Sequence, residues 1–158
     1  MRKLKIYLDT SVISHLFAED APEKMQETLD FWEAVKAGKY EVYIYEAVTD
    51  ELNKNREPKL SRLYSHMTEI QVITLDENAE VLALAKIYEE NNLLPKKSRF
   101  DRLHIAYAVV NGCDLLLSWN FSHLANIDTV NKVKSVNAVN NYKEMLIVPP
   151  TMLLGEGE

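Results

Sequence analysis

The chain has 158 residues, enough for one domain with a real core, and its 47% hydrophobic and 27% charged residues are typical of a globular protein. Its apolar runs, such as IAYAVV, are too short to cross a bilayer, and the basic N-terminus reaches an acid before a signal-type apolar region develops. A single cysteine, Cys113, excludes an internal disulfide and favours a reducing compartment, so we expect a cytoplasmic protein without membrane contact. The net charge of −6 argues against binding of nucleic acid through overall charge, but not against a nuclease whose carboxylates bind metal.

The first half of the chain is expected to alternate between strand and helix. In chain order, the predicted elements are a strand at KLKIYL, helices at SVISHLF and APEKMQETLDFWEAVKAG, a strand at YEVYIY, and short helices at AVTDELNK and PKLSRLYSHMTE. In the longest of these helices Asp20 is the expected N-cap, Pro22 suits the first turn, and Gly38 follows the end.

The second half continues the alternation. In order, it contains a strand at QVITL, helices at ENAEVLALAKIYEENN and SRFDRLHIAYAVVNG, a strand at DLLLSW, a helix at NIDTVNKVKSVNAVN, and a short strand at EMLIVP. Strands separated by helices predict βαβ units and a mostly parallel sheet covered on both faces, which is an α/β fold. We therefore predict one domain over residues 1–150 and a frayed tail over 151–158.

Acidic residues occur where the predicted strands end. Asp9 ends the first strand, Glu51 lies in the helix beyond the second, and Asp101 lies in the first turn of the helix before the fourth. Asn120 follows that fourth strand. Because a parallel sheet gathers the carboxyl ends of its strands at one edge, we expect these side chains to approach one another. Three carboxylates suit Mg²⁺ or Mn²⁺, whereas a lone cysteine and unpaired histidines do not favour zinc.

Each of these residues also has an interpretation that needs no ligand. Asp9 can cap the helix that follows it, and SRFD fits a capping box with its serine as the cap and Asp101 at the third helical position. Glu51 can be an exposed helix acid. His104, one turn past Asp101, is expected to be packed or hydrogen-bonded rather than a ligand. Asp114 can be a turn residue, and its place before a strand puts it at the opposite edge of the sheet.

The stretches YLDTSVIS, TDELNK and FDRLHIAYAVVNGCDLLLSWNFSHL resemble the PIN domain family, and within it the VapC-type toxins of bacterial toxin–antitoxin systems. The resemblance covers about residues 5–150, and its first and third motifs are the specific ones. It implies a three-layer α/β/α fold and metal-dependent cleavage of RNA phosphodiester bonds. Asp9, Glu51 and Asp101 match the first three family acids. Asn120 stands where an aspartate is common, which weakens a second metal site and leaves a lower or divergent activity open.

The resemblance implies a ribonuclease toxin that uses Mg²⁺ or Mn²⁺. Asp9, Glu51 and Asp101 are the predicted metal ligands, and Asn120 is the fourth residue of the predicted catalytic site. RNA is expected to contact the basic residues that flank Asp101, although a solvated loop is an equal interpretation of that run; these residues are Lys96, Lys97, Arg99 and Arg102. A catalytically degenerate PIN-like domain that binds RNA or a protein, and a nuclease that acts on DNA, remain open alternatives.

We also expect protein partners. The predicted assembly is a homodimer that binds a small antitoxin, whose C-terminal segment carries a basic residue into the acidic site. Candidates for an apolar docking groove are Phe17, Leu29, Phe31 and Trp32. Burial in the core of this domain is the competing interpretation for at least half of them.

Overall fold

The protein is described here by a computed structural model that covers residues 2–154. Its centre is a sheet of five strands in the order β3-β2-β1-β4-β5, and every neighbouring pair is parallel. The strands are β1 (Leu4–Leu8), β2 (Tyr40–Tyr45), β3 (Val72–Leu75), β4 (Leu115–Leu117) and β5 (Leu146–Val148). All five strands were predicted from the sequence, and the parallel sheet is confirmed.

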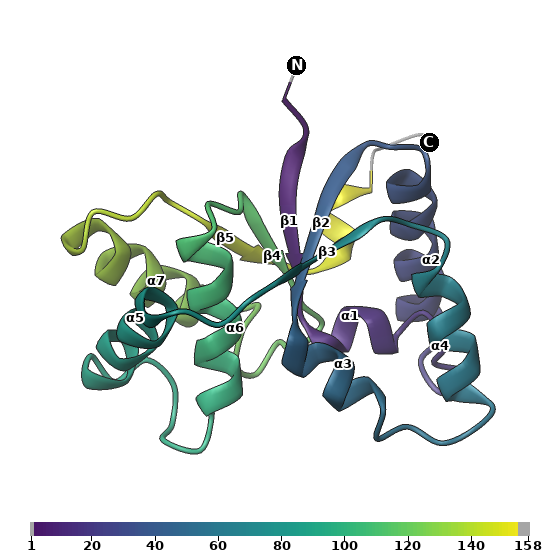
Figure 1. The fold of residues 1–158 in the computed structure, drawn as a ribbon, viewed down its shortest axis with the longest axis horizontal. Coiled ribbons are helices and arrows are strands. Elements are labelled where there is room, and N and C mark those ends of the chain that lie inside the picture. The colour runs from purple at the N-terminus through teal and green to yellow at the C-terminus, as the bar shows by residue number, and fades with distance from the viewer. Residues whose placement is uncertain (1, 155–158) are drawn as a thin grey trace.

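Helices cover both faces of this sheet. They are α1 (Thr10–Ser14), α2 (Pro22–Lys36), α3 (Glu46–Leu52), α4 (Lys59–Met67), α5 (Ala79–Glu90), α6 (Arg99–Val110) and α7 (Ile127–Val139), followed by the 3₁₀ helix η1 (Pro150–Leu153). Figure 1 shows α5, α6 and α7 to one side of the strands and α2 and α4 to the other, with α1 and α3 at the lower edge. The predicted three-layer α/β/α fold is therefore confirmed.

The central strand β1 determines where the site lies. Its residues Ile6, Tyr7 and Leu8 are fully buried, as expected for a strand covered by helices on both faces. Leu8 pairs with Leu117 of β4, so Asp9 and Ser118 leave the sheet side by side. This register brings together two segments that are more than 100 residues apart in the sequence.

One predicted helix cap is wrong, and a second has the predicted position but lacks its hydrogen bond. Ala21, not Asp20, is the N-cap residue of α2, and no side chain there caps the helix, although Pro22 does occupy the first turn. Ser98 is the N-cap residue of α6, but its hydroxyl makes no capping bond and is buried without a partner. Its ψ of 39° lies outside the extended region from which a serine side chain reaches the first-turn amides.

The predicted frayed tail is also wrong for the residues that the structure describes. Residues 151–153 belong to η1, which packs against α2, and the hydroxyl of Thr151 donates a hydrogen bond to Glu27 at 2.9 Å. Pro150, the first residue of η1, is buried. The remainder of the predicted tail, residues 155–158, lies outside the described residues.

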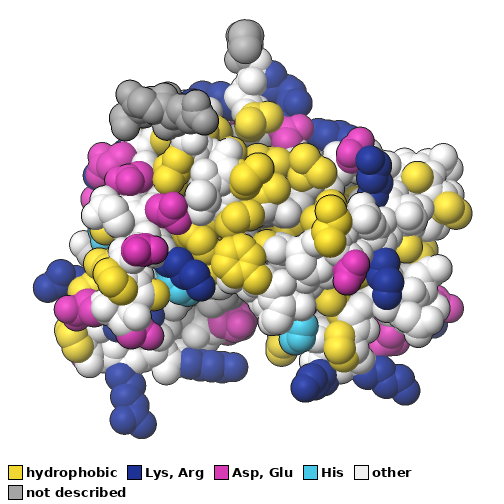
Figure 2. Space-filling model, turned by 180° about the vertical axis from the view of Figure 1, so that it is seen from behind, with side chains coloured by type: hydrophobic (Ala, Val, Ile, Leu, Met, Phe, Trp, Pro, Cys, Tyr) yellow, Lys and Arg dark blue, Asp and Glu magenta, His cyan; other side chains and the backbone are white. Residues whose placement is uncertain are grey.

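Most apolar side chains are buried, but some gather on one face. Phe31 and Trp32, two of the candidate docking residues, are each only 1% exposed and belong to the core, while Phe17 and Leu29 are half-buried. Figure 2 shows hydrophobic side chains collected in the middle of the rear face. Both β5 and η1 lie at the back in Figure 1, and they carry exposed Leu146 and Met152. Among the described residues, no helix has the length and apolarity needed to span a bilayer.

Asp114 lies at the amino edge of the sheet, opposite Asp9, as its place before β4 predicted. Its carboxylate accepts hydrogen bonds from the guanidinium of Arg2 at 2.9 and 3.1 Å, from the backbone amide of Lys5 at 2.8 Å, and from the amine of Lys143 at 2.6 Å. These interactions, with that of Arg2 the largest, hold the pKa of Asp114 well below its usual value. The acid therefore connects the start of β1 to the segments around β4 and β5.

We expect Asp114→Asn to lower the free energy of unfolding by about 1 kcal/mol at neutral pH, because its ionic partners are largely exposed. A carboxylate with a depressed pKa stabilises the fold above its usual pKa and loses that effect as the pH falls through the depressed value. The difference from wild type should therefore shrink below about pH 4. Urea unfolding at pH 7 and at pH 3 measures both quantities, and a difference that grows in acid would contradict the assignment.

Candidate active site

Asp9 is the most constrained acid at the carboxyl edge of the sheet. It is the N-cap of α1 in an extended conformation, and its Oδ1 accepts hydrogen bonds from the Ser11 hydroxyl at 2.6 Å and the Val12 amide at 3.2 Å. Its Oδ2 accepts the Ser118 hydroxyl at 2.5 Å, and the residue is only 4% exposed. The capping interpretation is confirmed, and it applies at the edge where a ligand site was predicted.

Burial and polar contacts act on Asp9 in opposite directions. Desolvation is the largest effect and raises the pKa of the carboxyl, while the nearby His104 and the hydrogen bonds from Ser11, Ser118 and Val12 lower it. Because burial disfavours the charged form of this carboxylate, a positive ion bound next to it would stabilise it.

Glu51 projects from α3, the helix that follows β2. Its Oε1 accepts the Thr10 hydroxyl at 2.9 Å and lies 3.7 Å from Nε2 of His104. The nearby imidazole of His104 is the main cause of a lowered Glu51 pKa, and the hydrogen bond from Thr10 adds to it. The alternative of a simple exposed helix acid is therefore wrong. His104 is buried, with Nδ1 2.8 Å from the Tyr7 hydroxyl, which confirms a hydrogen-bonded histidine.

Asp101 and Asn120 are joined by His123, which sequence reasoning missed. Nδ1 of His123 lies 3.2 Å from Oδ2 of Asp101. The amide of His123 donates to Oδ1 of Asn120 at 3.0 Å, and the amide of Asn120 donates to the Ser118 hydroxyl at 2.9 Å. Since Ser118 also contacts Asp9, polar contacts run from Asp9 to Asp101. The side-chain oxygen of Asn120 is thus engaged by the turn that follows it.

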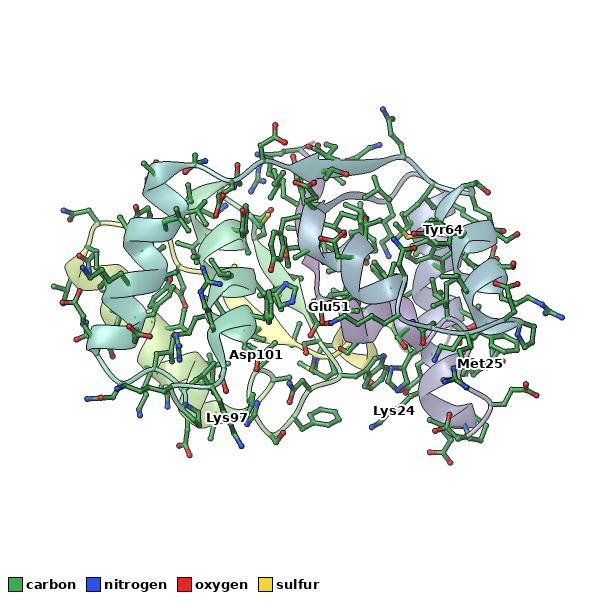
Figure 3. The ribbon with its side chains drawn as sticks, turned by 60° about the horizontal axis from the view of Figure 1, so that its bottom comes forward. Lys24, Met25, Glu51, Tyr64, Lys97 and Asp101 are labelled. Atoms are coloured by element: carbon green, nitrogen blue, oxygen red, sulfur yellow. The ribbon has the colours of Figure 1, made fainter. Side chains whose placement is uncertain are left out.

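The carboxylates offer the chemistry of a magnesium site without a preformed cluster. Asp9, Glu51 and Asp101 present hard oxygen donors of the kind that Mg²⁺ and Mn²⁺ prefer. Within residues 2–154, however, no three Asp, Glu, His or Cys side chains lie close enough together to hold a metal ion. Each acid is hydrogen-bonded to a different partner, and Figure 3 shows Glu51 and Asp101 on the same side of the molecule. The donor types fit the ion, and the side chains must turn to enclose it.

The chain is similar to a known domain family in sequence and to a solved structure in fold. A model of the PIN domain matches residues 6–121. The chain belongs to the PIN domain family. Its fold is similar to the crystal structure of VapBC2 from Rickettsia felis bound to a DNA fragment from their promoter, with a TM-score of 0.54 and 12% sequence identity over 92% of this chain and 98% of that chain. At this identity the similarity supports the fold alone. No curated protein sequence matches the chain significantly.

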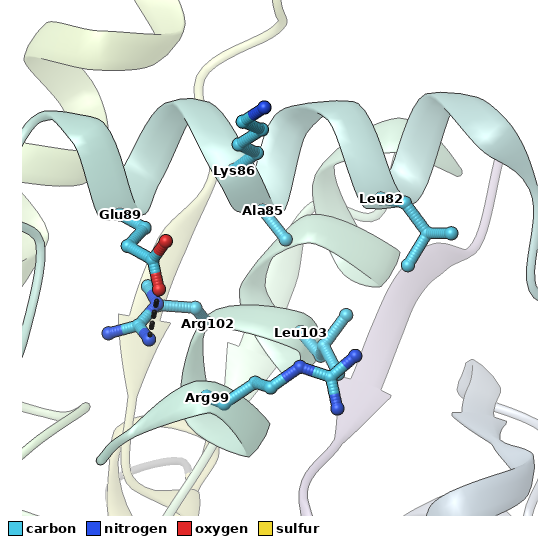
Figure 4. A pocket seen from close by; sticks show the side chains of 7 residues that line it. All are labelled: Leu82, Ala85, Lys86, Glu89, Arg99, Arg102 and Leu103. Carbon is cyan, nitrogen blue, oxygen red and sulfur yellow. Dashed lines mark hydrogen bonds and ion pairs between the residues drawn. The ribbon is translucent and has the colours of Figure 1, made fainter. Parts of the chain in front are cut away.

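The basic residues predicted to contact RNA are exposed, except for Arg102, which is buried. Lys96 and Lys97 are exposed in the loop before α6, and Figure 3 shows Lys97 on the same side of the molecule as Asp101. Lys24 of α2, which sequence reasoning missed, lies on that side as well. Figure 4 shows Arg99 in the groove between α5 and α6, near Leu82 and Leu103. Contact of Lys96, Lys97 and Arg99 with RNA stays a prediction.

The prediction that Arg102 contacts RNA is wrong. The residue is 2% exposed, and its guanidinium donates to the carbonyls of Pro95 at 2.7 Å and Lys96 at 2.9 Å, and to the carboxylate of Glu89 at 3.3 Å (Figure 4). The guanidinium also donates to a third carbonyl, that of Leu93, at 3.3 Å. These bonds satisfy a buried charge and hold the loop that carries the exposed lysines.

We expect Arg102→Met to lower the free energy of unfolding by about 2–4 kcal/mol, because it leaves buried carbonyls without donors. Arg99→Met, on the same helix but exposed, is the matched control and should change stability by no more than about 0.5 kcal/mol. Denaturant unfolding measures both variants, and hydrogen exchange should show faster opening of residues 93–97 in the first variant only. Equal stability of the two variants would contradict the anchoring role.

Proposed function

We propose that this PIN domain is a metal-dependent ribonuclease that hydrolyses phosphodiester bonds in RNA. The observation that carries the proposal is the placement of Asp9, Glu51 and Asp101. Asp9 follows β1, Glu51 lies in α3 and Asp101 lies in α6. Polar contacts through Ser118, Asn120 and His123 connect Asp9 to Asp101, and Glu51 bonds Thr10, the residue after Asp9. The PIN domain match over residues 6–121 adds support, because it contains all three acids.

At this edge some residues would bind the metal, and others orient those ligands or shift their pKa. Asp9, Glu51 and Asp101 would hold Mg²⁺ or Mn²⁺, which supplies a water of lowered pKa and neutralises charge on the phosphate. Ser11 and Ser118 hold Asp9 in one orientation, since each hydroxyl bonds a different carboxylate oxygen. His104 and Thr10 lower the pKa of Glu51 and so favour its charged form. Asn120 holds the turn that places His123 beside Asp101.

Asp9→Asn should abolish metal-dependent cleavage of single-stranded RNA, with a loss of at least about 100-fold. Loss of a residue that only orients a metal ligand already costs about 10–100-fold. Asp114→Asn is the matched control, because it changes a partly buried carboxylate at the opposite edge and should leave the rate unchanged. Cleavage of a labelled oligonucleotide with Mn²⁺, together with calorimetric Mn²⁺ binding, measures both effects. Full activity or full metal affinity in Asp9→Asn would refute the site.

Two alternatives are separated by the same measurements. A non-catalytic PIN domain that binds RNA or a protein is favoured by one observation: no group of three metal-binding side chains is preformed among residues 2–154. In that case the wild-type protein binds RNA without cleaving it at any Mn²⁺ concentration. A nuclease that acts on DNA would cleave a single-stranded DNA of the same sequence faster than the RNA.

We further propose an antitoxin partner and a homodimer. Asp9, Glu51 and Asp101 suit an arginine from a partner, whose planar guanidinium can pair with carboxylates at two points. The hydrophobic side chains that gather in the middle of the rear face suit a second copy of this chain (Figure 2). The fold similarity to VapBC2 is consistent with an antitoxin partner.

Coexpression with the product of a short adjacent gene should yield a stable complex with suppressed ribonuclease activity. Substituting alanine for the arginine nearest the partner's C-terminus should restore activity without dissolving the complex. Light scattering gives the mass of the isolated chain and of the complex, and a monomer at micromolar concentration would refute the homodimer. A complex with undiminished activity would argue against the toxin assignment but leave the nuclease intact.

A further inference from the structure

An open pocket of about 520 Å³ lies between two segments that both lead into the carboxylate site. One wall is formed by residues 92–95, which precede the lysine-bearing loop and Asp101. The other wall is drawn from residues 121–132, which begin directly after Asn120 and include the turn with His123. The pocket is therefore adjacent along the chain to the segments that carry Asp101 and Asn120.

Phe121 forms an exposed aromatic surface in the pocket. The side chain is 47% exposed, although it neighbours the buried Trp119, whose ring centroid is 6.1 Å away at an interplanar angle of 73°. Trp119 is itself fixed, because its Nε1 donates to the Thr28 hydroxyl at 2.9 Å. The exposed ring therefore stands on a rigid support, which lowers the entropy that a stacking partner must overcome.

One lysine lies next to this ring and another lines the pocket, although the chain as a whole carries −6. Nζ of Lys24 lies 5.4 Å from the centroid of Phe121 and 5.7 Å from that of Trp119. Lys132 lines the pocket, with Asp128 as the acid in the lining, and the exposed Lys96 is the next residue in the chain after Pro95. An aromatic face beside several lysines complements a base and its phosphate.

We propose that this pocket is a subsite for one nucleotide of single-stranded RNA, whose base stacks on Phe121 while its phosphate faces Lys24 and Lys132. The inference rests on the proposed ribonuclease function and names how the substrate is held next to the acids. The volume lies in the range of small-ligand sites. Because every base has a π-face, this subsite positions the strand and tolerates different bases.

The test measures binding of a short single-stranded RNA containing 2-aminopurine, with EDTA present so that the strand stays intact. Phe121→Ala should raise Kd about 5- to 100-fold and abolish stacking-induced quenching of the base. Phe121→Leu should behave like alanine, because it keeps the apolar bulk but lacks the π-face, and Phe121→Trp should retain binding. Tyr64→Ala, which removes a 37% exposed aromatic side chain from α4, is the matched control and should bind like wild type.

Lys24→Ala tests the charge separately. It should weaken RNA binding and reduce the slope of log K against log salt concentration by about 0.7, the value for one phosphate contact on a single strand. Thermal unfolding of each variant establishes that the fold is intact, as the exposure of Phe121 leads us to expect.

The outcomes distinguish this inference from the proposed function. Wild-type Kd values for Phe121→Ala and Phe121→Leu, in a protein that cleaves RNA, would overturn the subsite and leave the ribonuclease intact. Binding that depends on Phe121 without any cleavage would support the subsite and refute catalysis. A wild-type protein that neither binds nor cleaves RNA would overturn both. Phe121-dependent binding of single-stranded DNA or of the protein partner, with none of RNA, would also overturn the subsite.

Discussion

The structure depends on one buried carboxylate at the end of one buried strand. Asp9 receives hydrogen bonds from Ser11 and Val12 of α1 and from Ser118 beyond β4. An acid in this position would destabilise the fold if it lacked these donors, because desolvation of a charged group is costly. The same three bonds therefore start α1, join it to the segment after β4, and orient the central acid of the site. Stability and site geometry are coupled at this residue.

The environments of Asp9 and Glu51 differ in a way that suits a metal site. Burial raises the pKa of Asp9, whereas contact with His104 lowers the pKa of Glu51. A nearby cation would therefore stabilise the charged form of Asp9, whereas the charged form of Glu51 is already favoured by its neighbours. His104 is held by the hydroxyl of Tyr7 and lies between β1 and α3. A buried histidine held by a hydrogen bond can thus shift the pKa of a neighbouring acid.

Around this centre, side chains that look alike in sequence have different roles. Arg102 has the charge of an RNA contact but is buried, and it holds the loop that exposes Lys96 and Lys97. Lys24, on the distant α2, lies over the rings of Trp119 and Phe121. The basic surface is thus assembled from separate elements around the acids, which explains how a chain with a net charge of −6 can present positive charge locally.

The sequence by itself determined the order of strands and helices and the position of the acids at one edge, because apolar periodicity and strand ends are local features. It also indicated the family, through the motifs around Asp9 and Asp101. Only the tertiary structure decided which partners those acids have. Ser118 and Asp9 are 109 residues apart, and His123 and Asp101 are 22 apart, so their contacts follow from strand register and loop path. The backbone angle of Ser98 and the burial of Arg102 were likewise decided by packing, which no local pattern encodes.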